Sequence, residues 1–99
     1  RLIADFADHP VMLLRNHGML TLGRTPGEAF MLQYYFARAA KIQLMMQASG
    51  VPIIAPPDDV CEHAARQFWD LKGDIKIPGE REWPGFLRQL DREDPSYRD

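Results

Sequence analysis

One long helix dominates what this sequence can fold into. The stretch TPGEAF places Thr25 as an N-cap, Pro26 at the first helical position and Glu28 three residues after the cap, which together form a capping box. Gly50 is a suitable residue just beyond the helix end, and a proline two residues later prevents continuation. We therefore predict a helix from about Pro26 to Ser49, roughly 36 Å long.

The predicted helix is apolar over nearly its whole circumference. One apolar stripe consists of Ala29, Leu32, Phe36, Ala39 and Ala40, and most of the remaining surface consists of Phe30, Met31, Tyr34, Tyr35, Ile42, Met45 and Met46. The hydroxyls of Tyr34 and Tyr35 could reach a binding site, but a helix rich in Met and aromatic residues is more often core or subunit interface. A helix of this kind must be covered on several sides. The rest of the chain offers too little cover, so either chain missing from this sequence or neighbouring subunits must supply it. We expect self-association with this helix near the interface.

Short elements precede the helix. Leu2, Ile3 and Phe6 have helical spacing, which predicts a short helix over residues 1–7. Residues 11–14 form an apolar run that is too short for a helix, and we expect a buried strand there. A second short strand is expected after Gly18, ending at Gly23. The two strands should form an antiparallel hairpin, or else a sharp bend within one strand.

Two further helices are expected after the connector VPIIAPP. Asp58 or Asp59 should cap the first of them, which should run to about Lys72. The second should cover residues 81–92, with Pro84 in its first turn. Its inward-facing residues should be Trp83, Phe86, Leu87 and Leu90.

The composition is that of an ordinary globular protein, 45% apolar and 26% charged with a formal net charge of -2. No basic stripe is present, so no nucleic-acid partner is expected. The single cysteine, Cys61, cannot form an internal disulfide; we expect it to be partly buried and the protein to be cytoplasmic. No apolar run approaches the roughly 20 residues of a membrane span, so no membrane association is expected. The sequence opens like the end of a helix, and we expect further chain upstream.

The stretch LLRNHGML places His17 inside a predicted turn, between Asn16 and Gly18. A metal-binding imidazole requires a rigid position of this kind, and glycine leaves room beside the ring. The alternative is that His17 only completes the turn. Arg15 and Arg24 flank this corner in the sequence and could meet an anionic substrate, although solvated surface arginines are the commoner case.

These residues carry a family resemblance. Residues 11–30, VMLLRNHGMLTLGRTPGEAF, resemble a segment of the class II aldolase/adducin family: Leu-Leu-x-Asn-His-Gly, a short strand, Gly, then Glu-Ala-Phe. The stretches YYFARAAKIQL and EWPGFLRQLDREDPSY are similar to members of that family as well. The resemblance implies that residues 1–99 are the C-terminal part of a single domain. It also implies an α/β fold, a layered and largely antiparallel sheet flanked by helices, of which this chain supplies a terminal hairpin and about three helices.

The resemblance implies a metal-dependent lyase of the aldolase type, or an epimerase, acting on a small hydroxylated carbonyl or sugar-phosphate substrate. In the family, the Asn-His-Gly histidine is one of three that hold a divalent ion, usually Zn²⁺, which acts as a Lewis acid. This maps a metal ligand onto His17, with Asn16 and Gly18 as candidate substrate-binding residues.

Two parts of the family pattern are missing from this sequence: a His-x-His pair and an upstream acidic residue that serves as acid or base. His9 lies in a predicted loop, and Cys61 and His63 diverge on a helix at i and i+2. We therefore expect no catalytic residue in this chain and no zinc held by this chain alone, because zinc requires at least three protein ligands. The alternative reading is a non-catalytic, adducin-like interaction or oligomerisation domain. Family members are commonly tetramers, which also predicts a homo-oligomer.

Overall fold

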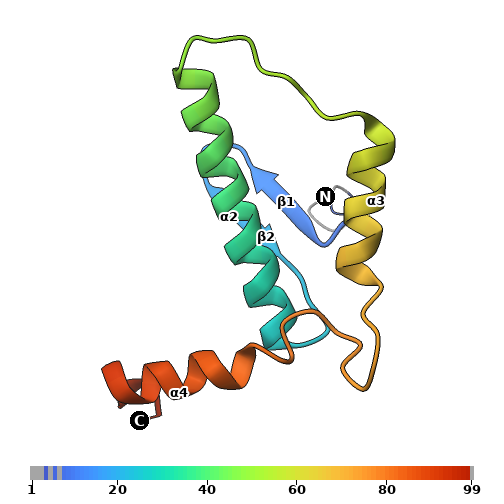
Figure 1. Cartoon of the computed structure of the whole chain (residues 1–99). Helices are drawn as coiled ribbons and strands as arrows, with labels where there is room; N and C mark the ends of the chain where they lie inside the picture. The colour runs from blue at the N-terminus through green and yellow to red at the C-terminus, as the bar shows by residue number, and fades with distance from the viewer. Residues whose placement is uncertain (1–3, 5, 7, 99) are drawn as a thin grey trace.

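The computed structural model describes Ala4, Phe6 and residues 8–98 (Figure 1). Within these residues the secondary structure consists of β1 (Val11–Leu14), β2 (Gly18–Thr21), α2 (Pro26–Ala48), α3 (Asp58–Trp69), α4 (Trp83–Glu93) and the 3₁₀ helix η1 (Pro95–Arg98). The α/β class is therefore confirmed, with the hairpin and three helices as expected. The larger layered sheet stays a prediction. Of the short helix expected over residues 1–7, Leu2 and Ile3 lie outside the described residues.

β1 and β2 form an antiparallel hairpin, with Val11 opposite Thr21 and Leu14 opposite Gly18. The backbone N–H of Leu22 donates to the carbonyl of Pro10 at 2.9 Å, which extends the pairing beyond the strands. The expected buried strand is only half-buried, and Leu13 is exposed. That part of the prediction was wrong because a two-stranded hairpin cannot cover both of its own faces.

α2 lies across one face of the hairpin (Figure 1). It begins where predicted: the hydroxyl of Thr25 accepts a hydrogen bond from the backbone N–H of Glu28 at 3.1 Å. Its end is one residue earlier than expected, with Ser49 as the C-cap, followed by Gly50 at φ 72°. The hydroxyl of Thr21 donates to the carbonyl of Ala29 at 3.2 Å and ties β2 to the first turns of the helix.

α3 differs from its prediction at both ends. Its N-cap is Pro57, and Asp58 and Asp59 lie in the first turn without any side-chain cap bond, where they complement the helix dipole instead. The helix ends at Trp69, three residues before the expected Lys72. After the helix, Leu71, Ile75 and Ile77 line a pocket together with Phe68 of α3 and Met31 and Tyr35 of α2. Cys61 is exposed on α3, so the expectation of partial burial was wrong.

α4 begins two residues later than expected and has Pro84 in its first turn, as predicted. It crosses the N-terminal end of α2, where the ring of Phe30 lies 5.6 Å from that of Trp83 and 5.0 Å from that of Phe86. Trp83 and Leu87 are half-buried, whereas Phe86 and Leu90 stay exposed, so the inward face is only partly covered.

The loop before α4 docks on the start of α2 through two glycines. Gly79 has φ 90°, and a Cβ added there would overlap the carbonyl of Gly27 and the side chain of Met31. A Cβ on Gly27 would in turn lie 3.1 Å from the carbonyl oxygen of Gly79. Both glycines are buried, and their missing side chains are what lets the two backbones approach.

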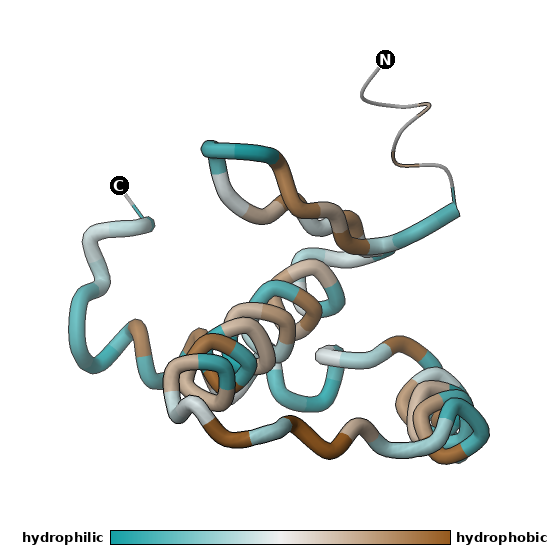
Figure 2. The backbone as a smooth tube through the Cα atoms, turned by 90° about the horizontal axis from the view of Figure 1, so that it is seen from above, coloured by the Kyte–Doolittle hydropathy of each residue, from teal (hydrophilic) through white to brown (hydrophobic). Residues whose placement is uncertain are grey.

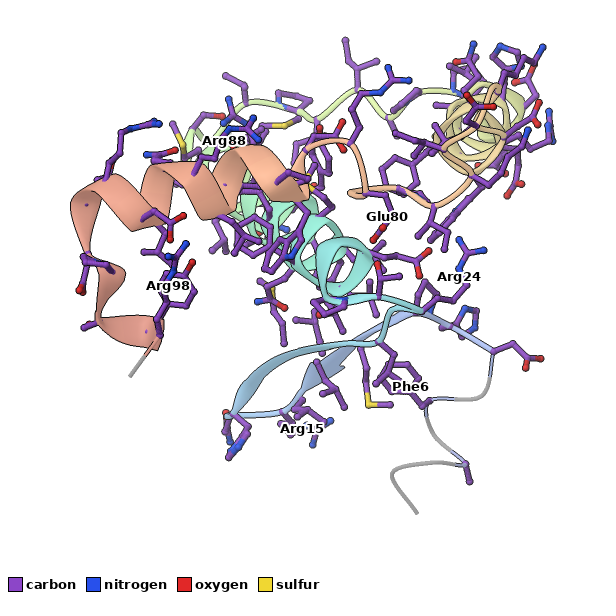
Figure 3. The ribbon with its side chains drawn as sticks, turned by 90° about the horizontal axis from the view of Figure 1, so that it is seen from below. Phe6, Arg15, Arg24, Glu80, Arg88 and Arg98 are labelled. Carbon is purple, nitrogen blue, oxygen red and sulfur yellow. The ribbon has the colours of Figure 1, made fainter. Side chains whose placement is uncertain are left out.

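The buried core is small for a chain of this length. Among the described residues, the buried hydrophobic side chains are Phe6, Met31 and Leu32. Phe6 lies against the hairpin on the side opposite α2 (Figure 3). The radius of gyration is 16.5 Å, compared with about 13 Å for a compact domain of 100 residues. Figure 2 shows strongly apolar stretches along the connector between α2 and α3, at the outside of the fold.

Candidate functional site

The turn between β1 and β2 holds the predicted site residues. Arg15, Asn16 and His17 connect the strands, and the backbone N–H of His17 donates to the carbonyl of Leu14 at 3.1 Å, which closes the turn. Asn16 adopts φ 55°, the left-handed region that asparagine tolerates better than most residues. The turn is thus closed by the hydrogen bond between His17 and Leu14 and by the pairing of β1 with β2, the strands that flank it.

The side chain of His17 is exposed at the tip of this turn. Gly18 has φ 151°, and a Cβ added there would meet nothing within 4 Å apart from its chain neighbours, so the turn is uncrowded at this glycine. Asn16, His17 and Gly18 therefore form one accessible corner. The structure brings these three predicted residues together by their adjacency in the turn.

The other predicted metal-binding side chains lie elsewhere. His9 precedes β1 and is separated from His17 by the four-residue strand, about 13 Å at the rise of a β-strand. Cys61 and His63 are exposed on α3. Among the described residues, no group of three or more His, Cys, Asp or Glu side chains is arranged to hold a metal ion.

A polar cluster that was not predicted as a site lies at the opposite end of the hairpin. The carboxylate of Glu28 is only 3% exposed and pairs with the guanidinium of Arg24, whose Nη2 donates to Oε1 at 2.6 Å and whose Nε donates to Oε2 at 3.1 Å. The hydrogen bonds from the Arg24 side chain, together with the donation from its backbone N–H, hold the pKa of Glu28 below its ordinary value against the opposing effect of burial. The pairing raises the pKa of Arg24.

This cluster corrects two predictions. In a capping box, the Glu28 side chain would accept from the backbone N–H of the cap residue Thr25. Instead it accepts from the backbone N–H of Arg24 at 2.5 Å, one residue earlier. Arg24 is also not beside the His17 turn, because the length of β2 separates them. The Arg-x-x-x-Glu spacing at the helix start is the signal that could have predicted this pair.

An open groove of about 760 Å³ adjoins this cluster. It is lined by Phe6, Asp8, His9, Pro10, Leu22, Gly23, Arg24, Glu28, Trp69 and Lys76. His17 is not among these residues, and Figure 3 shows Arg15 of the turn at one end of the hairpin and Arg24 at the other. The groove and the predicted corner are therefore two separate places on the described part of the molecule.

Comparison with known proteins bears on the turn and the helix start. Residues 1–44, which include both, match the family model described as the class II aldolase and adducin N-terminal domain. An aldolase class 2 protein of Caulobacter vibrioides, whose name gives that assignment as provisional, is 34% identical over 100% of this chain. The chain belongs to the class II aldolase/adducin family. The resemblance found in the sequence is thereby confirmed.

Of two further relatives, one is named after aldolases and the other after adducin. A provisionally named aldolase class 2 protein of Pseudomonas aeruginosa is 31% identical over 99% of the chain, and an adducin-related protein of Schizosaccharomyces pombe is 30% identical over 98%. The chain spans 38% of the length of each bacterial relative and 31% of the adducin-related protein. No solved structure matches this chain. No helix in the described part of the chain has the length and apolar character needed to cross a membrane.

Proposed function

We propose that this chain is part of a metal-dependent class II aldolase-like enzyme, a lyase or epimerase that acts on a small hydroxylated carbonyl or sugar-phosphate substrate. His17 provides one ligand for a divalent ion, Zn²⁺ by family resemblance. Asn16 and Gly18 contact the substrate beside it. The enzyme works as a homo-oligomer, a tetramer by the same resemblance.

One observation carries this proposal: the exposed imidazole of His17 on a closed hairpin turn within the segment that matches the family model. The backbone of His17 is held to Leu14, so the ring projects from a fixed position. The open space at Gly18 leaves room for further ligands or a substrate. Neutral imidazole is also the side chain that suits zinc.

The residues of this chain do not by themselves fit a zinc centre. The ion requires at least three protein ligands at a catalytic site, and the described residues contain no group of three or more His, Cys, Asp or Glu side chains that could hold it. The remaining ligands and the acid or base therefore have to come from outside this sequence. No catalytic step is assigned to a side chain of the chain itself.

A non-catalytic role is the second candidate function. One relative is named an adducin-related protein, and much of the apolar surface of α2 is exposed in the single chain. In this reading the chain serves protein assembly, and His17 only completes the hairpin turn. The two candidates differ in whether removal of the imidazole has any effect beyond local folding.

The deciding experiment is a metal analysis of the complete natural protein that contains this chain. Zinc retained after dialysis and lyase activity on a panel of hydroxylated carbonyl compounds would be measured for the natural sequence and for His17→Ala. We expect His17→Ala to lower metal affinity by more than the roughly 10–100-fold seen when an outer partner of a ligand is lost. The circular dichroism spectrum should stay unchanged.

His63→Ala is the matched control, because His63 is also exposed but lies on α3. It should retain metal and activity. Retention of both in His17→Ala would refute the metal assignment and favour the assembly role. The same conclusion would follow if the natural protein retained no metal.

A further inference from the structure

The groove of about 760 Å³ beside the Arg24–Glu28 pair has a mostly ionisable polar lining. Its ionisable residues are Asp8, His9, Arg24, Glu28 and Lys76. The hollow between the start of α2 and α4 has a different character, because Glu93 is the one charged residue among the described residues that line it. We call the first of these the Arg24 groove. Figure 3 shows Arg24 at the base of the hairpin, away from the turn.

The lining of the Arg24 groove indicates what can fill it. Contact with more protein, from another copy or from chain outside this sequence, would remove several ionisable side chains from water, which is costly unless each of them is paired. Protein interfaces are accordingly depleted in charged residues at their centre. Residues 42–57, which contain no charged residue, are the kind of surface that such contact covers. The Arg24 groove is suited instead to a small ligand that leaves part of its lining in water.

The guanidinium of Arg24 is already fixed in place. Its Nη2 and Nε donate to the carboxylate of Glu28, which is only 3% exposed. Nη1 forms no hydrogen bond within the described part of the chain, and the side chain as a whole is 60% exposed. An acceptor that binds at Nη1 would therefore meet a planar donor whose rotamer freedom is already restricted.

Two other side chains complete the features of a ligand site. Lys76 is exposed and forms no ion pair within the described residues. Trp69, at the end of α3, is 43% exposed and offers an aromatic surface in the same groove. Ligand pockets typically measure roughly 300–1,000 Å³ and combine apolar walls with a few polar groups. The Arg24 groove fits this description.

We propose that the Arg24 groove binds a small aromatic carboxylate, with the carboxylate group on Arg24 and Lys76 and the ring against Trp69. The two cations are balanced by Asp8 and Glu28, so the lining has no net charge with His9 neutral, and a monoanion suits it better than a dianion. The groove is separate from the His17 corner. The proposal therefore goes beyond the proposed function and does not depend on the metal assignment.

The test is calorimetric titration of the complete natural protein with phenylacetate. We expect a dissociation constant on the order of 1 mM or lower, and weaker binding of the uncharged analogue 2-phenylacetamide. Lys76→Gln should raise the dissociation constant for phenylacetate about threefold to tenfold, and Trp69→Ala by a similar factor. Asp8→Asn should lower it, because a like charge is removed. Arg24 is left unchanged, since its loss would leave the buried carboxylate of Glu28 without a partner.

Two control variants make the result specific. Lys72→Gln is the matched control for Lys76→Gln, because Lys72 is exposed in the same loop but does not line the groove. His17→Ala should bind phenylacetate as the natural protein does, which separates the groove from a carboxylate bound to metal at the His17 corner. The proposal is overturned if the dissociation constant exceeds about 10 mM or if 2-phenylacetamide binds equally well. It is also overturned if Lys72→Gln weakens binding as much as Lys76→Gln, or if His17→Ala abolishes binding.

Discussion

At the residue scale, the best-defined polar feature is the Arg24–Glu28 pair. Glu28 lies in the first turn of α2 and is buried. Its carboxylate accepts hydrogen bonds from both the side chain and the backbone of Arg24. The hydroxyl of the N-cap residue Thr25 accepts a hydrogen bond from the backbone N–H of the same Glu28. These bonds anchor the turn between β2 and α2, so the pair joins the hairpin to the helix.

The Glu28 carboxylate should make folding stability depend on acid pH. Its pKa is lowered in the folded chain, chiefly by Arg24, so its contribution is fully present above the unfolded-state value of about 4.3. The contribution is lost as the pH falls through the lower folded-state pKa. We expect Glu28→Gln to be less stable than the natural chain at pH 7 and the difference to shrink below about pH 4.

Urea unfolding measured between neutral and acid pH would check this. Glu62→Gln is the control, because Glu62 is exposed on α3 and forms no ion pair within the described part of the chain. It should leave the pH profile unchanged. A Glu28→Gln profile parallel to that of the natural chain would show that the carboxylate does not contribute through its charge.

At the scale of elements, α2 organises the fold. The hairpin packs on one of its faces, α4 meets its first turns through Phe30, and the ring of Tyr35 lies 6.0 Å from that of Phe68 on α3. The backbones of Gly27 and Gly79 approach so closely that a Cβ on Gly79 would overlap the carbonyl of Gly27. This approach determines where the loop before α4 crosses the helix, and therefore where α4 lies.

Gly79→Ala should be strongly destabilising for two reasons. An alanine at φ 90° is strained, and its Cβ would overlap the backbone of Gly27. Gly73→Ala is a matched control, because Gly73 has φ 94° but nothing within 4 Å of an added Cβ. We expect Gly79→Ala to cost about 1–3 kcal/mol more than Gly73→Ala, the usual cost of overpacking. Equal midpoints in urea unfolding would show that the loop can move away from α2.

At the scale of the whole molecule, the chain is too open to bury its apolar residues alone. Its radius of gyration is 16.5 Å, and residues 42–57, the end of α2 and the connector to α3, are all exposed in the described structure. Fully burying one large apolar side chain contributes roughly 1.5–3 kcal/mol, so several exposed ones represent a large part of a small domain's stability. Contact with another copy or with chain outside this sequence would remove this surface from water.

The melting temperature should therefore depend on protein concentration. Association that favours the folded chain raises stability by mass action. We expect the Tm to rise by several degrees over about a hundredfold increase in protein concentration. The size of this shift follows from the usual dependence of Tm on the free energy of unfolding in domains of this size. The Leu44→Glu variant, which places a charge on the exposed apolar surface of α2, should lose this dependence. A Tm that is constant for the natural chain would show that the folded chain does not need a partner.

The sequence by itself determined the elements with strong local signals. Thr25, Pro26 and Gly50 mark the bounds of α2 to within one residue, because caps and breakers act through the backbone of their immediate neighbours. The apolar runs on either side of Asn16–His17–Gly18 predicted either a hairpin or a sharp bend within one strand, and the structure shows the hairpin. The same motif was sufficient for the family, which the comparisons confirm.

Tertiary structure decided what depends on distant parts of the chain. α3 ends at Trp69, and the apolar residues that follow it, Leu71, Ile75 and Ile77, line a pocket with Met31 and Tyr35 of α2, which lie more than thirty residues earlier in the chain. The partner of Glu28 is Arg24 and not the cap residue, since the turn after β2 directs both the backbone N–H and the side chain of Arg24 at the carboxylate. The exposure of Leu13 and Cys61 likewise depends on how little of the surrounding surface the chain can cover. Local patterns identify which elements form, but burial depends on which other elements reach them.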